Sequence, residues 1–164
     1  MMRISTLLFA GLLAFSVNGA HAASLPDACT LIPNTTAGKI LGATVTIKPI
    51  KTYGAPVSHC MYSTAHSGSF SLLIGRVHYK NAATELARQK QTAAAGWPPG
   101  MAKPTFTDIK GLGEAATLLK GQGFFQLHVL AHDIAVVINM NRHATAANIT
   151  QAKQLANVAL QHLD

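Results

Sequence analysis

Cysteine, tryptophan and acidic residues are scarce in this sequence, and each shortage argues against a class of site. Its 164 residues include two cysteines, one tryptophan and six acidic residues. Two cysteines make a poor zinc site, which normally takes four ligands. With so few carboxylates, no close pair suggests acid and base catalysis on glycosides. The eight histidines form neither a helical i, i+4 pair nor a His-Glu-x-x-His motif. We therefore expect no metal site and no bound cofactor.

Long hydrophobic runs are also missing, apart from one at the N-terminus that predicts an export signal. Arg3 precedes an apolar run over residues 4–17, and small residues at 20 and 22 suit a cleavage site. The run is shorter than the roughly 20 residues of a membrane-spanning helix. We predict a signal peptide over 1–22, a single domain over 23–164 and a periplasmic or secreted location, without a membrane span. A buried N-terminal helix is the alternative.

Positive charge is in excess but is not clustered. Thirteen lysines and arginines face six acidic residues, for a net charge of +7. No run of basic residues occurs, and aromatic residues are not interleaved with them, as a dedicated nucleic-acid-binding protein would require. The charge predicts only a weak attraction to polyanions. Nearly half of the residues are hydrophobic, so a folded domain is expected rather than a disordered chain.

Cys29 allows four interpretations: a lipid anchor, a nucleophile, a metal ligand or half of a disulfide. It lies well past the predicted cleavage site, which argues against lipidation. A nucleophile needs a base close by, but His59 is adjacent to Cys60, and adjacent strand residues point to opposite faces. An exported chain with an even number of cysteines favours a disulfide between Cys29 and Cys60.

Alternating and helical hydrophobic patterns predict helices and strands in separate blocks. Alternation of apolar and polar residues indicates a strand, and apolar residues three or four apart indicate a helix. The predicted helices cover 34–42, 81–96 and the residues after Thr145, and the strands cover 43–50, 58–64, 70–79, 115–119, 124–130 and 134–140. This order predicts an α+β fold: an antiparallel sheet of about five to six strands, helices packed on one face, and one disulfide.

Several short motifs resemble those of a broad group of bacterial exported proteins and lipoproteins of unknown function. They are Asp-Ala-Cys-Thr-Leu at 27–31, Cys-Met-Tyr at 60–62 and Gly-Leu-Gly-Glu-Ala-Ala at 111–116, followed by a C-terminal helix. Typical members carry Asp where this chain has Glu114, and many are lipidated. The resemblance covers nearly all of the mature chain. It implies a PsbP-like sandwich, export and the disulfide, and it transfers no catalytic residue.

Gly111 and Gly113 match the letters of a dinucleotide-binding fingerprint, with Asp133 about twenty residues further on. The context is wrong for that site, because the glycines do not open a helix and no βαβ unit follows. A tight turn into a strand, in which glycine supplies a positive φ, is the better interpretation.

Two pairs of polar residues are the candidate ligand-binding groups. Arg76 and His78 share one face of their predicted strand, as do Gln126 and His128 on theirs, because alternate strand residues point the same way. If these strands were neighbours, the four side chains would form a partly basic patch suited to a carboxylate or an acidic partner. A solvated strand end is the alternative.

Trp97 lies among prolines in a predicted loop and is a candidate aromatic anchor, although it could equally pack against the sheet. We predict an exported small domain that binds a protein partner or a small anionic ligand without catalysis. A periplasmic enzyme or metal-handling protein that uses dispersed histidines is the alternative. The sequence predicts no oligomeric state.

Overall fold

The computed structural model describes residues 24–52, 56–65, 68–78, 81–96, 100 and 102–163. The predicted signal peptide and Trp97 therefore lie outside the described residues. None of the described helices is long and apolar enough to cross a membrane. The elements in chain order are α1 (Ala28–Leu31), α2 (Asn34–Leu41), β1 (Val45–Pro49), β2 (Val57–Thr64), β3 (Ser69–Arg76), α3 (Ala82–Ala95), β4 (Thr105–Ile109), β5 (Ala115–Lys120), β6 (Phe125–Ala131), β7 (Ile134–Met140) and α4 (Ala146–Gln161).

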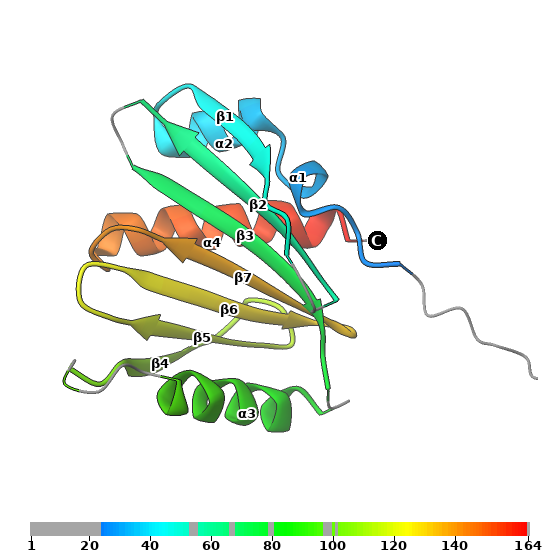
Figure 1. Cartoon of the computed structure of the whole chain (residues 1–164), viewed down its shortest axis with the longest axis vertical. Coiled ribbons are helices and arrows are strands. Elements are labelled where there is room, and N and C mark those ends of the chain that lie inside the picture. Colours follow the sequence, from blue (N-terminus) through cyan, green and yellow to red (C-terminus); the bar gives the residue numbers. More distant parts are fainter. Residues whose placement is uncertain are drawn as a thin grey trace, which may run out of the picture.

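The described strands form one antiparallel sheet of seven strands, in the order β1-β2-β3-β7-β6-β5-β4 (Figure 1). The prediction of five to six strands is therefore wrong, and the strand it missed is β4. This strand lies at the edge of the sheet, and its residues are exposed or only half-buried. Its apolar residues, Phe106 and Ile109, are three apart, so it lacks the period-two alternation that marks a strand in a sequence.

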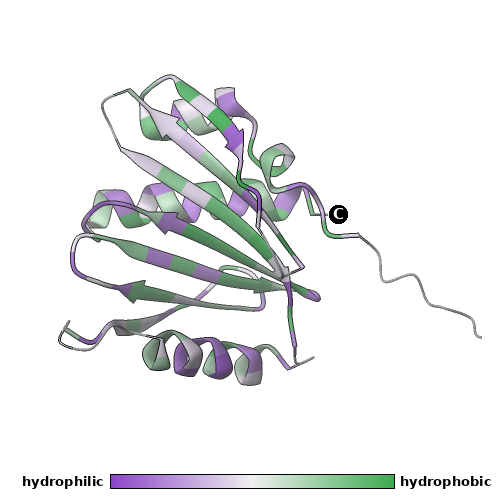
Figure 2. Cartoon of the chain, in the orientation of Figure 1, coloured by the Kyte–Doolittle hydropathy of each residue, from purple (hydrophilic) through white to green (hydrophobic). Residues whose placement is uncertain are grey.

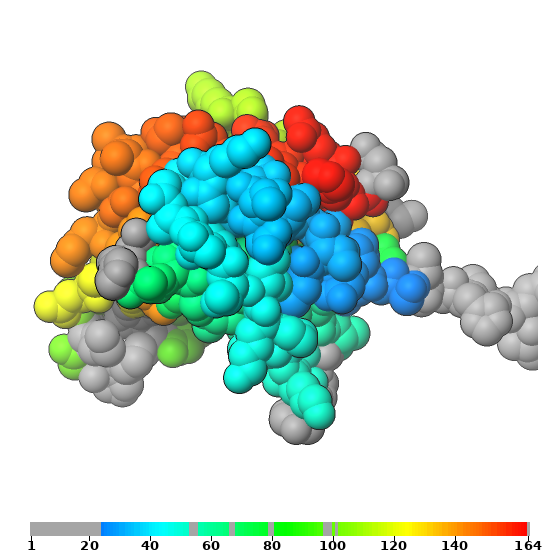
Figure 3. Space-filling view, turned by 90° about the horizontal axis from the view of Figure 1, so that it is seen from above, coloured from blue at the N-terminus to red at the C-terminus, as the bar shows by residue number. Residues whose placement is uncertain are grey.

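Helices cover both faces of the sheet, so the prediction that they pack on one face is also wrong. Helices α2 and α4 lie side by side on one side of the molecule (Figure 3). Helix α3 packs on the opposite face, where Leu86 contacts Leu130 and Ala135. These two sheet residues alternate with the residues that point toward α4, and α3 removes them from water.

The main core fills the space between the sheet and helices α1, α2 and α4. Alternate residues of β3, such as Leu72 and Ile74, point into it, as do Leu127 of β6 and Ile138 of β7. The residues that α4 contributes recur at helical spacing and are fully buried: Ala152, Leu155, Ala156 and Ala159.

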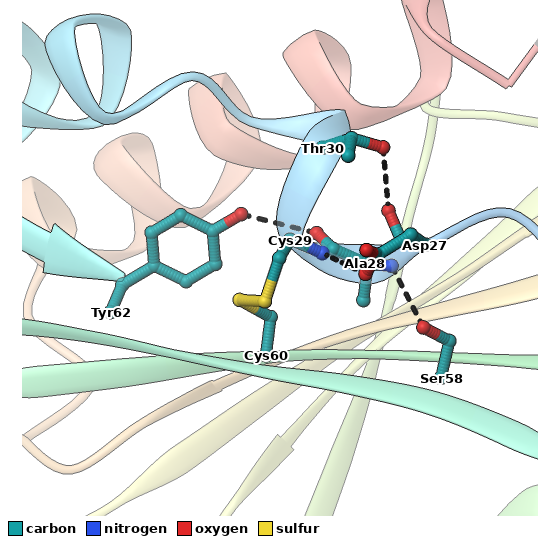
Figure 4. Close-up of a disulfide and its surroundings, with 7 residues drawn as sticks. All are labelled: Asp27, Ala28, Cys29, Thr30, Ser58, Cys60 and Tyr62. Carbon is teal, nitrogen blue, oxygen red and sulfur yellow. Dashed lines mark hydrogen bonds between the residues drawn. A yellow bond between two sulfur atoms is a disulfide. The ribbon is translucent and has the colours of Figure 1, made fainter. Parts of the chain in front are cut away.

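A disulfide attaches α1 to β2, as predicted. Cys29 and Cys60 are bonded, with 5.1 Å between their Cα atoms. Two hydrogen bonds reinforce this attachment (Figure 4): Tyr62 Oη donates to the Ala28 carbonyl at 3.1 Å, and the Ala28 N–H donates to Ser58 Oγ at 2.8 Å. Helix α1 is therefore held on the same face of the sheet as α4.

Gly111 and Gly113 form the turn between β4 and β5, as their spacing predicted. Both have positive φ, 71° and 59°. A Cβ atom on Gly113 would lie 2.5 Å from the carbonyl oxygen of Leu130, whereas a Cβ atom on Gly111 would meet nothing within 4 Å. Gly113 therefore serves a close approach between this turn and β6, as well as a left-handed conformation.

Candidate functional site

The two predicted residue pairs, Arg76 with His78 and Gln126 with His128, do not form one patch in the structure. Arg76 ends β3, His78 follows two residues later, and Gln126 and His128 lie on β6. Strand β7 lies between β3 and β6, so the condition for a shared patch is not met. Hydrophilic bands interrupt the hydrophobic surface of β6 (Figure 2), in keeping with its two polar residues.

Arg76 and His78 do meet at one pocket, which we call the strand-end pocket. It has a volume of about 360 Å³ and lies where β2 begins and β3 ends. Its lining residues are Pro56, Val57, Gly75, Arg76, Val77 and His78. Its lining residues are therefore mainly apolar, and Arg76 and His78 are the polar ones.

Gly75 keeps this pocket open. It pairs with Val57 across β2 and β3, and directly paired strand residues point to the same face. A Cβ atom at Gly75 would lie 3.4 Å from Val57 Cγ1. Gly75 does not have a positive φ, so glycine is not needed here for an unusual backbone conformation. Its contribution is the space that the missing side chain leaves.

The two polar lining residues each have a neighbour of opposite charge. Arg76 Nη1 bonds to Asp133 Oδ2, in a pair whose side chains are 32% and 63% exposed. The His78 backbone N–H donates to Glu85 Oε2 at 3.0 Å, while the His78 ring remains 68% exposed. Because both groups are accessible to solvent, they are also accessible to a ligand.

Glu85 of α3 is the buried centre of the polar contacts near this pocket. Its side chain is only 1% exposed, and its carboxylate accepts bonds from Arg88 Nη2 at 2.5 Å and Gln89 Nε2 at 3.0 Å. Burial alone raises the pKa of this carboxyl group. The bonds from Arg88, Gln89 and the His78 backbone outweigh burial and lower the pKa to about 2. Glu85 is therefore charged at neutral pH.

His128 extends these contacts to β6. Its Nδ1 lies 3.0 Å from Gln89 Oε1, and its Nε2 lies 3.0 Å from Gln126 Oε1. Burial lowers the pKa of His128 to about 4, so the ring is neutral at neutral pH. A neutral imidazole has a single N–H, so one contact requires the Gln126 amide to turn and donate. Both ring nitrogens are thus engaged by the protein.

Three predicted residues, His78, His128 and Gln126, are therefore linked through α3. The connecting residues, Glu85 and Gln89, were not among the candidates. One sequence signal could have identified them: Glu85 is the only acid in the predicted helix 81–96 and has Arg and Gln three and four residues later.

A second pocket, of about 450 Å³, brings Asp27, Ser58 and His59 to one surface. These residue types suggest a catalytic triad, but Asp27 accepts from Cys29 N and Ser58 from Ala28 N. Ser58 and His59 are adjacent in β2, so their side chains point to opposite faces. Among the described residues, no three His, Cys, Asp or Glu side chains are grouped as a metal site.

The acidic residues in the described segments are all engaged locally. Glu85, Asp108 and Asp133 each pair with a Lys or Arg side chain, Glu114 accepts from the His132 backbone, and Asp27 caps α1. Basic residues outnumber acids by thirteen to six, so the remaining surface charge is predominantly positive.

Comparison with known proteins gives no family for this chain. No protein-family model matches it, and no curated protein matches its sequence. Among solved structures, it is similar to a GTP binding regulator from Thermotoga maritima, with 12% identity and a TM-score of 0.43. The alignment covers 85% of this chain and 94% of that protein. At this TM-score, the likeness carries no argument about function.

Proposed function

We propose that this chain is an exported, non-catalytic domain that binds a small carboxylate with an apolar body in the strand-end pocket. The observation that carries this proposal is that Arg76 and His78 both line a pocket whose other lining residues are apolar or glycine. Its volume of about 360 Å³ is within the range of small-molecule sites. A guanidinium group binds a carboxylate through two parallel N–H bonds.

The charge balance favours an anion over a cation as the ligand. With every acid in the described segments engaged by a base, a backbone N–H or a helix cap, the surplus positive charge acts on whatever approaches. Asp133 competes for Arg76, but it is 63% exposed, and exposed ion pairs contribute only about 0–1 kcal/mol. A ligand carboxylate in the less exposed pocket competes well against such a pair.

The absence of catalysis is proposed because the buried titratable groups have structural partners. His128 contacts Gln89 and Gln126, and Glu85 is held by Arg88. For export, the support is the leader at 1–22 together with the disulfide between Cys29 and Cys60, which persists in oxidising compartments. The resemblance to exported bacterial proteins points to the same location.

Calorimetric titration with hexanoate and with its uncharged methyl ester tests the proposal. We expect the carboxylate to bind and the ester to bind at least tenfold more weakly, because the ester cannot form the charge-assisted bonds to Arg76. Arg76→Gln should reduce hexanoate affinity to that of the ester. Lys110→Gln, which removes the same charge from an exposed site after β4, should have no such effect.

His78→Ala supplies a second variant if Arg76→Gln does not fold, because the His78 side chain is 68% exposed and its replacement should be tolerated. It should weaken hexanoate binding several-fold, because His78 is one of the two polar residues that line the pocket. Equal binding of acid and ester would overturn the proposal, as would unchanged hexanoate binding in a folded Arg76→Gln variant.

A further inference from the structure

The two edges of the sheet differ in how well they are protected from an additional strand. Strand β1, at one edge, ends in Lys48 and Pro49, and both a lysine and a proline discourage pairing with another chain. Strand β4, at the other edge, reads Thr-Phe-Thr-Asp-Ile and pairs with β5 without a bulge. Its one charged residue, Asp108, is already paired with Lys90. The β4 edge is therefore open to pairing with an extended chain.

Two residues of β4 direct their backbone groups away from the sheet. Gly121 donates its N–H across the turn between β5 and β6, and residues of an antiparallel strand bond to alternate sides. Leu118 lies three residues earlier, so it bonds to β4, where its partner is Thr107. The neighbours of Thr107, which are Phe106 and Asp108, therefore point their N–H and C=O groups outward. No described residue bonds to those outward groups.

A third pocket, which we call the α3 pocket, lies between α3 and the strands at this edge. It has a volume of about 320 Å³, at the small end of the range for ligand sites. Its lining residues are Ala83, Leu86, Ala87, Lys90, Asp108, Ile109, Ala115 and Ala116. Ala116 belongs to the main core and Ile109 packs against it, so Leu86 and the other three alanines supply the apolar side chains of the walls. Because β4 is the outermost strand, the pocket borders the free edge.

Positive charge flanks β4 at both ends. Lys103 and Lys110 are exposed, lie outside the strand itself, and form no ion pair with a described residue. Seven positions of extended chain, about 23 Å, separate them. Lys120 lies opposite Thr105 and adds a third positive charge at one end. Charge complementarity therefore favours an acidic partner for this edge.

We infer that the β4 edge binds an extended acidic peptide, which adds a strand to the sheet and places one apolar side chain in the α3 pocket. Two residues in a hydrogen-bonded pair exchange both backbone bonds and point their side chains to the same face. Asp108 points to the α3 side, where it pairs with Lys90. The peptide residue opposite Asp108 therefore presents its side chain on that side, beside the α3 pocket.

This arrangement defines the peptide by its chemistry. Backbone bonds to the outward groups of Phe106 and Asp108 provide affinity, the apolar residue provides specificity, and acidic residues at the two ends lie near Lys103 and Lys110. The surface shares no lining residue with the strand-end pocket. The inference is therefore independent of the proposed function.

Fluorescence anisotropy with a labelled heptapeptide tests the inference. The peptide has a central leucine, a threonine on each side of it and two acidic residues at each end. Replacing the leucine with alanine should weaken binding at least tenfold, because less apolar surface is then buried in the α3 pocket. Methylation of the leucine nitrogen should weaken binding at least tenfold, because it removes the bond to Asp108. Methylation of the next nitrogen, which points to solvent, is the matched control.

Variants of the protein test the same contacts from the other side. Ala87→Leu fills the α3 pocket, so it should reduce the affinity of the leucine peptide to that of the alanine peptide. Ala95→Leu is the matched control, because it adds the same side chain to an exposed position of α3 that does not line the pocket. Replacing both Lys103 and Lys110 with glutamine should weaken the leucine and alanine peptides several-fold and by the same factor.

Four results would overturn the inference. One is equal binding of a peptide of the same composition with its leucine at one end, because charge alone would then explain the affinity. The others are equal affinities for the two N-methylated peptides, and a leucine peptide that binds Ala87→Leu as tightly as wild type. The last is a dimer in sedimentation velocity that the peptide dissociates, because the edge would then belong to a second copy of the chain.

Discussion

Glu85 is the buried charge of α3, and we expect Glu85→Gln to destabilise the protein by about 3 kcal/mol. The pKa of this carboxyl group is lowered from 4.5 to about 2. That change corresponds to about 3 kcal/mol of preference for the charged form in the folded state. The side chain is 1% exposed, so water screens its bonds little. Loss of one partner from a buried ion pair typically costs about 3–5 kcal/mol, in agreement with the value worked from the pKa.

The pH dependence follows from the direction of this pKa. A carboxyl group with a lowered folded-state pKa stabilises the fold fully above its unfolded value, here 4.5, and loses that contribution as the pH falls toward about 2. Urea unfolding followed by far-UV circular dichroism should therefore show a large difference between wild type and Glu85→Gln at neutral pH. The difference should shrink steadily below pH 4.5.

Glu114→Gln provides the matched control for this experiment. Glu114 is 47% exposed and lies 3.9 Å from the ring of His132, so its replacement should cost no more than about 1 kcal/mol. The reasoning is refuted if Glu85→Gln is as stable as wild type at neutral pH. It is also refuted if the stability difference stays constant from neutral to acid pH.

Two further predictions concern the covalent and steric constraints of the fold. Replacing both Cys29 and Cys60 with alanine should lower the free energy of unfolding by about 4 kcal/mol, because the disulfide closes a loop with a sequence separation of 31. In urea unfolding, a reductant should destabilise the wild type but not the variant. Gly113→Ala should destabilise the protein by several kcal/mol, because the added Cβ atom would clash with Leu130. Gly111→Ala should cost only about 1–2 kcal/mol, the usual cost of a left-handed backbone conformation in a residue other than glycine. Similar melting temperatures for the two glycine variants would contradict this account.

Most elements of this fold could be predicted because their signals are local. Alternating residues mark β1 and β6, and a short apolar run marks β7. The caps of the long helices are visible as Asn81 and Thr145, whose side chains accept from Thr84 N and Asn148 N. The disulfide could be inferred from two cysteines and a predicted export signal. Strand β4 could not be predicted, because it is an exposed edge strand that depends on pairing with β5.

The side on which α3 packs is a non-local property and was therefore missed. The helix carries little hydrophobic surface, and its position depends on Leu86 finding Leu130 and Ala135, which come more than forty residues later. The same applies to the candidate site. Arg76 and His78 could be singled out as residue types, but the polar contacts of Glu85, and the pocket that Gly75 leaves open, depend on elements that meet only in three dimensions.

The pairing of β3 with β7 places a late part of the chain at the centre of the sheet. Phe70 is opposite Met140, so the middle of the sheet cannot close until nearly the whole polypeptide is available. A chain emerging through a membrane pore would present β1, β2 and β3 first, with the apolar edge of β3 unpaired and prone to aggregation. Such a chain needs protection until its last strands and α4 arrive, and a C-terminal truncation would prolong that hazard indefinitely.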